Sequence, residues 1–315
     1  MTGLVVQNTG SLYLIKTKEG ELYNCRLKGN FKLNDIQTTN PVAVGDYVDF
    51  EYSQEENNQG EVGWITYIHP RRNYIIRRSS NLSKQAHILG SNLDRSLLLV
   101  TINYPVTSTT FIDRYLATAE AYRVETALVF NKVDRYGERE LEKMSTLMQL
   151  YQKLGYRCFQ ISAILNEGLE TIKEYIAHGV TLVSGHSGVG KSTFINQLIP
   201  GANLNTQEIS ELHNTGVHTT TYSEMLPYGT EEGTYLIDTP GIKGFGTIEF
   251  DHTHVGHYFR EIFELSKDCR FDDCTHTHEP MCAVLQALNT GQISRSRYTS
   301  YLSILNDENN SKYRL

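Results

Sequence analysis

A glycine-rich segment in the second half of the chain has the spacing of a phosphate-binding loop. It matches G-x-x-x-x-G-K-[ST] and lies between an expected strand at 180–183 and an expected helix at 194–198. Such glycines let backbone N–H groups face the α- and β-phosphates of a nucleotide, and the helix N-terminus adds positive potential. We expect Lys191 to reach the β- and γ-phosphates and Ser192 to bind Mg²⁺. The predicted loop consists of Gly185, His186, Ser187, Gly188, Val189, Gly190, Lys191, Ser192 and Thr193.

An acidic turn downstream of that loop fits the other half of a phosphate site. The turn Asp238-Thr-Pro-Gly241 directly follows an expected strand at 235–237. In P-loop enzymes such an aspartate holds Mg²⁺, here through a water molecule, and the glycine N–H contacts the γ-phosphate. Asp238 and Gly241 are therefore expected nucleotide-site residues, and Mg²⁺ is an expected cofactor.

A tetrapeptide upstream of the phosphate loop has the residues of a guanine site. Asn131, Lys132, Val133 and Asp134 directly follow an expected strand at 126–130. A carboxylate accepts hydrogen bonds from the N1–H and 2-amino groups of guanine, which adenine does not offer. Leaving that carboxylate unpaired opposite adenine costs about 1 to 3 kcal/mol. Asp134 is therefore predicted to select GTP over ATP, with the methylenes of Lys132 lying over the base.

A second segment completes the expected base site. Ser162 and Ala163 follow an expected strand at 158–161, where backbone groups reach guanine O6. Phosphate motifs precede base motifs in the usual GTPase, whereas here the base motifs come first. From residue 93 onward strands alternate with helical patterns, which indicates a parallel sheet with helices on both faces. The chain therefore predicts a circularly permuted α/β GTPase domain whose Asp238 turn leads into the C-terminal region.

Cysteines gather in the C-terminal region at a spacing typical of zinc sites. Cys269, Cys274 and Cys282 surround His276, and His278 is a second histidine nearby. In a chain without an export signal, such a cluster indicates metal binding rather than disulfides. Three thiolates and one imidazole close a tetrahedral, structural Zn²⁺ site that leaves no position for water. The two remaining cysteines lie in expected strands and are predicted core residues.

A basic segment interrupts a chain whose net charge is −7. Arg71, Arg72, Arg77 and Arg78 flank an apolar stretch at 74–76. We expect an exposed hairpin whose guanidinium groups bind RNA phosphates. The alternative is a solvated linker that is ion-paired to the acidic remainder of the chain.

The first part of the chain has the pattern of a small β-barrel. Short strands are expected at 12–15, 22–27, 47–52 and 64–68. A five-stranded OB-type barrel fits this length, and its exposed face often binds oligonucleotides; a barrel used only for packing is the alternative. The predicted organisation is multidomain: an all-β OB-type barrel (1–69), a basic linker (70–92), the permuted α/β P-loop GTPase domain (93–245) and a helical zinc-binding domain (246–315).

With these motifs the chain resembles the ribosome small-subunit-dependent GTPase A (RsgA) family over essentially its whole length. The resemblance rests on the barrel, the permuted motif order, the segment His218-Thr-Thr-Thr221 and the pattern Cys269-x4-Cys274-x-His276-x5-Cys282. It implies His276, rather than His278, as the fourth zinc ligand. It also implies a late assembly factor that binds the 30S subunit and its 16S rRNA. That subunit would stimulate hydrolysis of GTP to GDP, and hydrolysis would release the factor.

The motifs do not identify the residue that orients the attacking water. In Ras-like enzymes a glutamine directly after D-x-x-G has this role, and Ile242 stands there. His218 matches the catalytic histidine of the family, and an imidazole can orient or deprotonate water near neutral pH. A role in shaping the switch segment is the alternative. We expect Thr220, or else Thr219, to complete the Mg²⁺ shell. The predicted catalytic residues are Lys191, His218 and Thr220, and the predicted Mg²⁺ ligands are Ser192, Thr220 and Asp238.

Composition limits the remaining possibilities. The 315-residue chain is 39% hydrophobic and 21% charged, as ordinary globular proteins are. Its apolar runs fall short of the roughly 20 residues that a membrane span needs, so we expect a cytoplasmic monomer without membrane contacts. Two rival hypotheses remain. One is a permuted GTPase that acts on the large subunit or on a protein, and the other is a nucleotide-gated RNA-binding module whose turnover is incidental.

Overall fold

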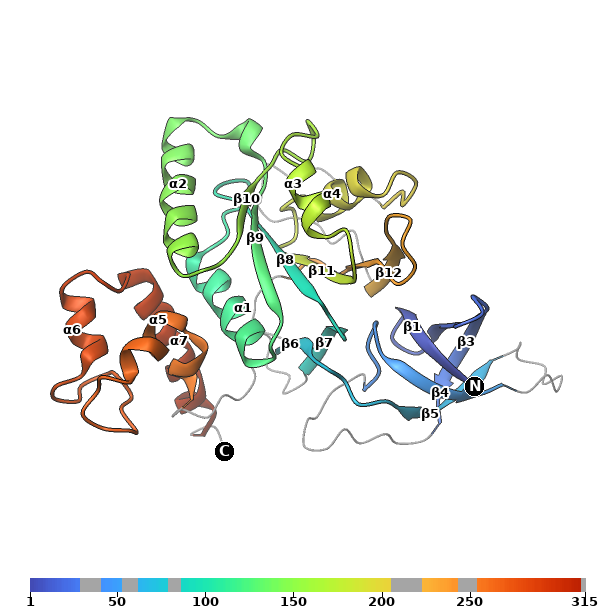
Figure 1. Ribbon diagram of the computed structural model, residues 1–315, viewed down its shortest axis with the longest axis horizontal. Helices are drawn as coiled ribbons and strands as arrows, with labels where there is room; N and C mark the ends of the chain where they lie inside the picture. The colour runs from blue at the N-terminus through green and yellow to red at the C-terminus, as the bar shows by residue number, and fades with distance from the viewer. Residues whose placement is uncertain (29–40, 53–61, 79–85, 205–222, 243–253, 313–315) are drawn as a thin grey trace.

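The computed structural model describes residues 1–28, 41–52, 62–78, 86–204, 223–242 and 254–312. Along the longest axis of the molecule a helical C-terminal part and an N-terminal barrel lie at opposite ends, with an α/β domain between them (Figure 1). Within the described residues, none of the helices has the length and apolar character that crossing a membrane requires.

The N-terminal part is a closed five-stranded barrel. Its strands pair in the order β1-β2-β3-β5-β4, and β4 pairs back onto β1. Inward-facing side chains such as Val5, Ile15 and Ile65 are fully buried. This topology confirms the predicted barrel, although its first strand escaped the sequence pattern because a bulge after Val5 interrupts the alternation. The strands are β1 (Thr2–Asn8), β2 (Tyr13–Thr17), β3 (Leu22–Leu27), β4 (Tyr47–Glu51) and β5 (Gly63–Ile68).

The central domain is built on a mostly parallel sheet. Its strands lie in the order β10-β9-β8-β11-β13-β12, and only the edge strand β12 is antiparallel to its neighbour in this order. Near-continuous apolar runs such as LLLV in β8 suit strands that are covered on both faces. The strands are β8 (Arg95–Val100), β9 (Glu125–Phe130), β10 (Cys158–Gln160), β11 (Val180–Gly185), β12 (Ser223–Pro227) and β13 (Tyr235–Asp238).

Helices cover both faces of that sheet. Alternate strand residues point to opposite sides, so that Leu98 and Leu182 face one apolar core while Leu97 and Val183 face the other. The first core also contains residues of α1 (Thr109–Ala121) and α2 (Glu138–Lys153), and the second contains residues of α3 (Glu170–Tyr175) and α4 (Lys191–Leu198). This arrangement confirms the predicted α/β architecture.

The segment expected to be an exposed basic hairpin forms a hairpin, but the apolar residues of its two strands are buried. β6 (Tyr74–Arg78) and β7 (Ala86–Ser91) form their own two-stranded sheet. Ile75 and Leu89 are buried in the core that α1 and α2 share with the large sheet. The apolar stretch between the arginines therefore contributes core packing to the central domain.

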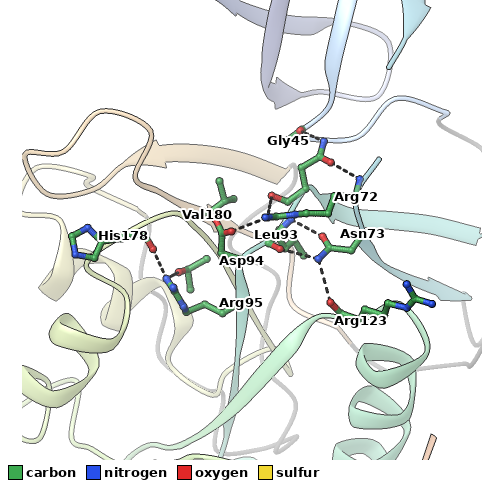
Figure 2. Close-up of polar contacts among 11 residues, drawn as sticks. Gly45, Arg72, Asn73, Leu93, Asp94, Arg95, Arg123, His178 and Val180 are labelled. Atoms are coloured by element: carbon green, nitrogen blue, oxygen red, sulfur yellow. Dashed lines mark hydrogen bonds and ion pairs between the residues drawn. The ribbon is translucent and has the colours of Figure 1, made fainter. Parts of the chain in front are cut away.

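Among the described residues, a strand pairing and a polar cluster help to join the barrel to the central domain. The edge strand β12 pairs with β1 at Gln7–Glu224 and Asn8–Ser223, so one continuous sheet runs from the central domain into the barrel. A polar cluster at the start of β8 forms the second contact, in which the Asn92 side chain donates to the Gly45 carbonyl of the barrel at 2.8 Å. In the same cluster Arg72 is ion-paired with Asp94, whose carboxylate also accepts the backbone N–H of Val180 (Figure 2). The polar cluster lies at the opposite edge from the carboxyl ends of the parallel strands, whereas the β12–β1 pairing lies at that edge, because Glu224 also pairs with Asp238 at the end of β13.

The C-terminal part packs against α1 of the central domain. It consists of η2 (Val255–Tyr258), α5 (Arg260–Ser266), α6 (Ala283–Asn289) and α7 (Arg295–Lys312). The Arg297 side chain, which is 1% exposed, donates to Asp113 of α1 at 2.8 Å and to Glu261 at 2.7 Å. Ala117 of α1 lies in the apolar core of this part. A buried ion network and an apolar contact therefore fix the helical part to the central domain.

Candidate nucleotide and metal sites

Four predicted nucleotide segments lie at one edge of the central sheet. Asn131 follows β9, Ser162 follows β10, the phosphate loop begins at the end of β11, and Asp238 ends β13. These strands run parallel, so their carboxyl ends share one edge, which is where α/β sheets bind ligands. Position in the sheet, rather than order in the chain, brings the segments together.

The phosphate loop has the backbone that its glycines permit. The φ angles of Gly185, Gly188 and Gly190 are +151°, +81° and +96°, a region that residues with a Cβ rarely adopt. A Cβ on Gly190 would lie 2.5 Å from Nδ2 of Asn131. Glycine is thus required there twice, for the conformation of the loop and for its close approach to the base segment.

Lys191 begins α4 and is buried within the loop that precedes it. Its Nζ donates hydrogen bonds to the carbonyl oxygens of Gly185 and His186 at 2.9 and 2.8 Å. Burial lowers the pKa of Lys191 to about 8, and the Asp238 carboxylate partly opposes this shift. Phosphate oxygens form stronger, charge-assisted hydrogen bonds with an ammonium group than carbonyl oxygens do. The amine is therefore held where phosphates could replace its present partners.

Asn131 links the base segments to the phosphate loop. Its Nδ2 donates to the Val189 carbonyl at 2.8 Å, and its Oδ1 accepts the Ala163 N–H at 3.0 Å. Lys132 donates from Nζ to the carbonyls of Gly188 and Tyr104, both at 2.6 Å. One asparagine and one lysine thus hold three separate loops in register.

Asp134 lies at the exposed end of this assembly. It is the middle residue of the short 3-10 helix η1 (Val133–Arg135), and its side chain is exposed, whereas Ser162 and Ala163 are buried. Val133 is tied to the end of β10 through its N–H, which donates to the Ile161 carbonyl. The carboxylate is thus available to a base, next to backbone groups of the Ser162 loop.

The Asp238 turn packs directly on the phosphate loop. A Cβ on Gly241 would lie 2.8 Å from the Cα of Ser187, and the Ile242 N–H donates to the Gly185 carbonyl. Asp238 and Ser192 are 1% and 8% exposed. One carboxylate and one hydroxyl beside a lysine are oxygen donors of the kind that Mg²⁺ accepts together with substrate phosphates. The two residues therefore fit the predicted Mg²⁺ site.

The predicted catalytic histidine and switch threonines lie outside the described residues. His218, Thr219 and Thr220 all belong to the segment between Leu204 and Ser223. Their roles remain predictions.

His186 has a role in the loop that the motif did not reveal. Its ring stacks on Phe111 of α1 with centroids 3.8 Å apart, and Nδ1 lies 2.8 Å from the Ile242 carbonyl. Burial lowers the pKa of His186, with the Ile242 hydrogen bond opposing, so the neutral ring donates Nδ1–H to that carbonyl. His186 therefore joins the phosphate loop to α1 and to the Asp238 turn. His186 stands at one of the x positions of the motif, where any residue is allowed, so the motif could not predict this contact.

The four predicted zinc ligands meet in the C-terminal part. The ligand atoms of Cys269, Cys274, His276 and Cys282 all lie within 4.8 Å of one another. Sγ of Cys282 lies 3.9 Å from Sγ of Cys269 and 3.5 Å from Nδ1 of His276. Tetrahedral Zn²⁺ with usual bond lengths places two sulfurs about 3.8 Å apart and a sulfur and a nitrogen about 3.6 Å apart. The donor set and its spacing fit one structural Zn²⁺.

Neighbouring groups hold the zinc loop in shape. Tyr298 and Tyr301 of α7 donate to the carbonyls of His276 and Thr275 at 2.8 and 2.7 Å. Glu279 accepts three backbone N–H groups of the loop; burial alone would raise its pKa, but these bonds and the Thr275 hydroxyl hold the pKa far below the usual range. His278 is exposed and is not part of the cluster of ligand atoms.

The four arginines do not form one exposed set. The side chain of Arg71 is 8% exposed and makes two hydrogen bonds to the buried Asp46 carboxylate, so the expectation that it faces RNA is wrong. Arg72 is exposed but ion-paired with Asp94 at 2.8 Å. Arg77 is half-buried, and the side chain of Arg78 lies outside the described residues.

Two family models match the chain. The model for the RsgA GTPase matches residues 68–248, and the model for the RsgA N-terminal domain matches residues 2–62. The first match covers the hairpin, the central sheet and every predicted base and phosphate segment, and the second covers strands β1 to β4 of the barrel and ends just before β5.

Relatives and solved structures resemble the chain over nearly its full length. Proteins named small ribosomal subunit biogenesis GTPase RsgA are 56% identical over 314 residues in Bacteroides fragilis and 55% identical over 315 residues in Porphyromonas gingivalis. Each alignment covers 100% of this chain and 99% of the relative. The crystal structure of YjeQ from Thermotoga maritima is 32% identical, with a TM-score of 0.71 over 97% of both chains. YloQ, described as a circularly permuted GTPase, is 23% identical with a TM-score of 0.66, covers 100% and 96% of the two chains, and shares the fold.

Proposed function

The chain belongs to the RsgA GTPase family, and from that premise we propose that this GTPase binds the small ribosomal subunit during its late assembly. The 30S subunit, contacted through its 16S rRNA, stimulates hydrolysis of GTP, and hydrolysis releases the protein. The observation that carries this proposal is the identity of about half of all residues, over the full length, with relatives named for small-subunit biogenesis. We further propose a cytoplasmic monomer with the four-part organisation predicted from the sequence.

The nucleotide site follows from the geometry of the loops. Guanine binds between the tetrapeptide and the Ser162 loop, where the exposed Asp134 carboxylate meets N1–H and the 2-amino group. The phosphates bind the amides of the phosphate loop, and Lys191 leaves two carbonyl oxygens to contact them. Ser192, Asp238 and Thr220 would hold Mg²⁺, which would supply charge neutralisation at the phosphates. Gly241 lies close enough to the loop for its N–H to contact the γ-phosphate.

Hydrolysis needs a group that orients water, and Ile242 is not that group. Its side chain is fully buried and apolar, and its backbone is bonded to Gly185 and His186. We therefore assign water orientation to His218. Because a phosphoryl transfer site works mainly by positioning and charge stabilisation, the subunit increases the rate if it fixes the segment that carries His218.

The Asp238 turn links the nucleotide to the C-terminal part in this proposal. The turn is bonded to the phosphate loop at Ile242, and the chain continues from there towards η2. A γ-phosphate that contacts Gly241 therefore acts on the segment that leads to the zinc-binding part. Contacts with rRNA are proposed for Arg72, Arg77 and Arg78 but not for Arg71, whose side chain is buried against Asp46.

Steady-state hydrolysis tests the proposed function. GTP turnover of the zinc-loaded protein would be measured alone and with 30S, 50S and 70S particles, and ATP would serve as the control substrate. We expect stimulation by 30S only, and we expect His218→Ala to lose that stimulated rate while it still binds GTP. Stimulation by 50S instead, or by no particle despite tight GTP binding, would overturn the proposal in favour of a large-subunit factor or an RNA-binding module.

A further inference from the structure

Tyr136 occupies a position that no nucleotide motif includes. It comes two residues after Asp134, and it is 9% exposed. Its hydroxyl accepts the Ile102 backbone N–H at 2.9 Å and donates to the Asn131 backbone carbonyl at 2.6 Å. Burial raises the pKa of Tyr136 to about 12, so the hydroxyl keeps its proton at neutral pH. One hydroxyl thus satisfies a buried donor and a buried acceptor from two different loops.

These two hydrogen bonds act on the residues that surround the base site. The side chain of Asn131 is fixed by Val189 and Ala163, and the Tyr136 hydroxyl fixes its backbone as well. The Tyr136 N–H donates to the Val133 carbonyl and closes the turn that carries Asp134. The turn is therefore held at both of its ends.

The position of Asp134 depends on that turn. In the part of the chain that the structure describes, its carboxylate makes no hydrogen bond or ion pair of its own. The backbone of η1 therefore sets where the carboxylate lies, together with its attraction to the Lys132 ammonium. A shift of the turn would move the carboxylate away from the edge of a base, and catalytic and binding groups lose their effect when they are displaced by about 1 Å.

The loop after β8 is the support against which Tyr136 holds the turn. This loop, residues 101–107, is closed on itself by hydrogen bonds between Thr101 and Thr107 at 2.9 and 3.1 Å. It makes two contacts with the base segment: the Ile102 N–H donates to the Tyr136 hydroxyl, and the Tyr104 carbonyl accepts the Lys132 ammonium. A fourth loop, which contains no base or phosphate motif, thus belongs to the base site.

We propose that the Tyr136 hydroxyl is a positioning group for guanine specificity, which fixes the Asn131–Asp134 backbone against the loop after β8. This inference rests on the proposed assignment of Asp134 as the residue that contacts guanine. The inference adds Tyr136, which holds Asp134 in place, to Asp134, which contacts the base.

The test compares GTP with ITP, whose base lacks the 2-amino group. Tyr136→Phe keeps the ring in the core and removes only the hydroxyl, which leaves the Ile102 N–H and the Asn131 carbonyl unpaired. We expect the affinity for GTP to fall roughly tenfold and the affinity for ITP to change much less, so that the GTP:ITP preference shrinks. The kcat for GTP at saturation should remain within about twofold, because the phosphate site is untouched.

A matched control distinguishes positioning from general loss of stability. Tyr115→Phe makes the same change at a fully buried tyrosine of the same domain, whose hydroxyl lies 2.6 Å from Ser96 Oγ. It should leave the GTP:ITP preference at the wild-type value. A Tyr136→Phe variant with the wild-type preference would overturn the inference while leaving Asp134 in its role. A wild-type protein that binds GTP and ITP equally would instead overturn the assignment of Asp134, and this inference with it.

Discussion

The zinc loop and the nucleotide site are built in opposite ways. All four zinc ligands come from one short segment, Cys269–Cys282, and their ligand atoms lie within 4.8 Å of one another. The nucleotide residues come from segments that follow four different strands, and side chains such as Asn131 and Lys132 join them across more than fifty residues of chain. The comparison teaches that a local site takes its ligands from one segment, with support from a neighbouring helix, whereas a distributed site depends on the whole sheet.

Removal of a zinc ligand should have the largest effect and should remain local. Apparent binding energies of structural zinc reach about 10 kcal/mol or more, and that energy is folding energy of the segment that binds it. Cys274→Ser should therefore lose zinc and unfold the C-terminal part, which metal analysis and limited proteolysis would detect. GTP affinity should change by less than about twofold, because no residue after Ile242 contributes to the described nucleotide site.

His278→Ala is the control for that experiment, since His278 is exposed and outside the ligand cluster. It should keep one zinc per chain and resist the protease as the wild type does. If Cys274→Ser weakened GTP binding strongly, the two sites would be coupled and the contrast between them would fail.

A smaller effect is expected where the helical part joins the central domain. Arg297→Met leaves the Asp113 carboxylate buried without its cationic partner, which typically costs about 3 to 5 kcal/mol. Thermal or denaturant unfolding would measure this loss. Zinc content should stay at one per chain, because all four ligands and Glu279 lie within one segment, and the Arg297 hydrogen bonds go to Asp113 and Glu261 outside it.

The ion pair at the barrel side provides the matched control for this prediction. The side chains of Arg72 and Asp94 are 57% and 32% exposed, so Arg72→Met should cost about 0 to 1 kcal/mol (Figure 2). If Arg297→Met also lost zinc, the zinc loop would need the contact between the helical part and the central domain. That result would contradict its description as a local site.

The difference between a local and a distributed site also explains how much of the structure could be predicted from the sequence alone. The zinc ligands and the phosphate loop could be predicted, because both are short patterns whose chemistry is set by residue type and spacing. The buried position of Arg71 could not be predicted, since its partner Asp46 lies in another strand connection of the barrel. The roles of Ile102 and Tyr104 were also out of reach, because backbone groups carry no residue signature.

The smallest predicted effect concerns the charge on Lys191. Burial lowers its pKa to about 8 in the nucleotide-free protein, with Asp238 opposing, and phosphates that bind the ammonium would raise the pKa in the complex. A group whose pKa rises on binding takes up a proton at higher pH. GTP affinity should therefore be constant below about pH 7 and fall as the pH rises through 8, by roughly eightfold between pH 7.5 and pH 9. Nucleotide titrations in this range would measure it.

Titrations with GMP, compared with those with GTP, would show which lysine causes this pH dependence. Burial also lowers the pKa of Lys132 to about 8, but that side chain lies at the base site, whereas Lys191 serves phosphates that GMP lacks. A fall in affinity that is present with GTP and absent with GMP assigns the effect to Lys191. The same fall with both nucleotides would assign the pH dependence to Lys132. The base segment, and not the phosphate loop alone, would then respond to the charge state of the site.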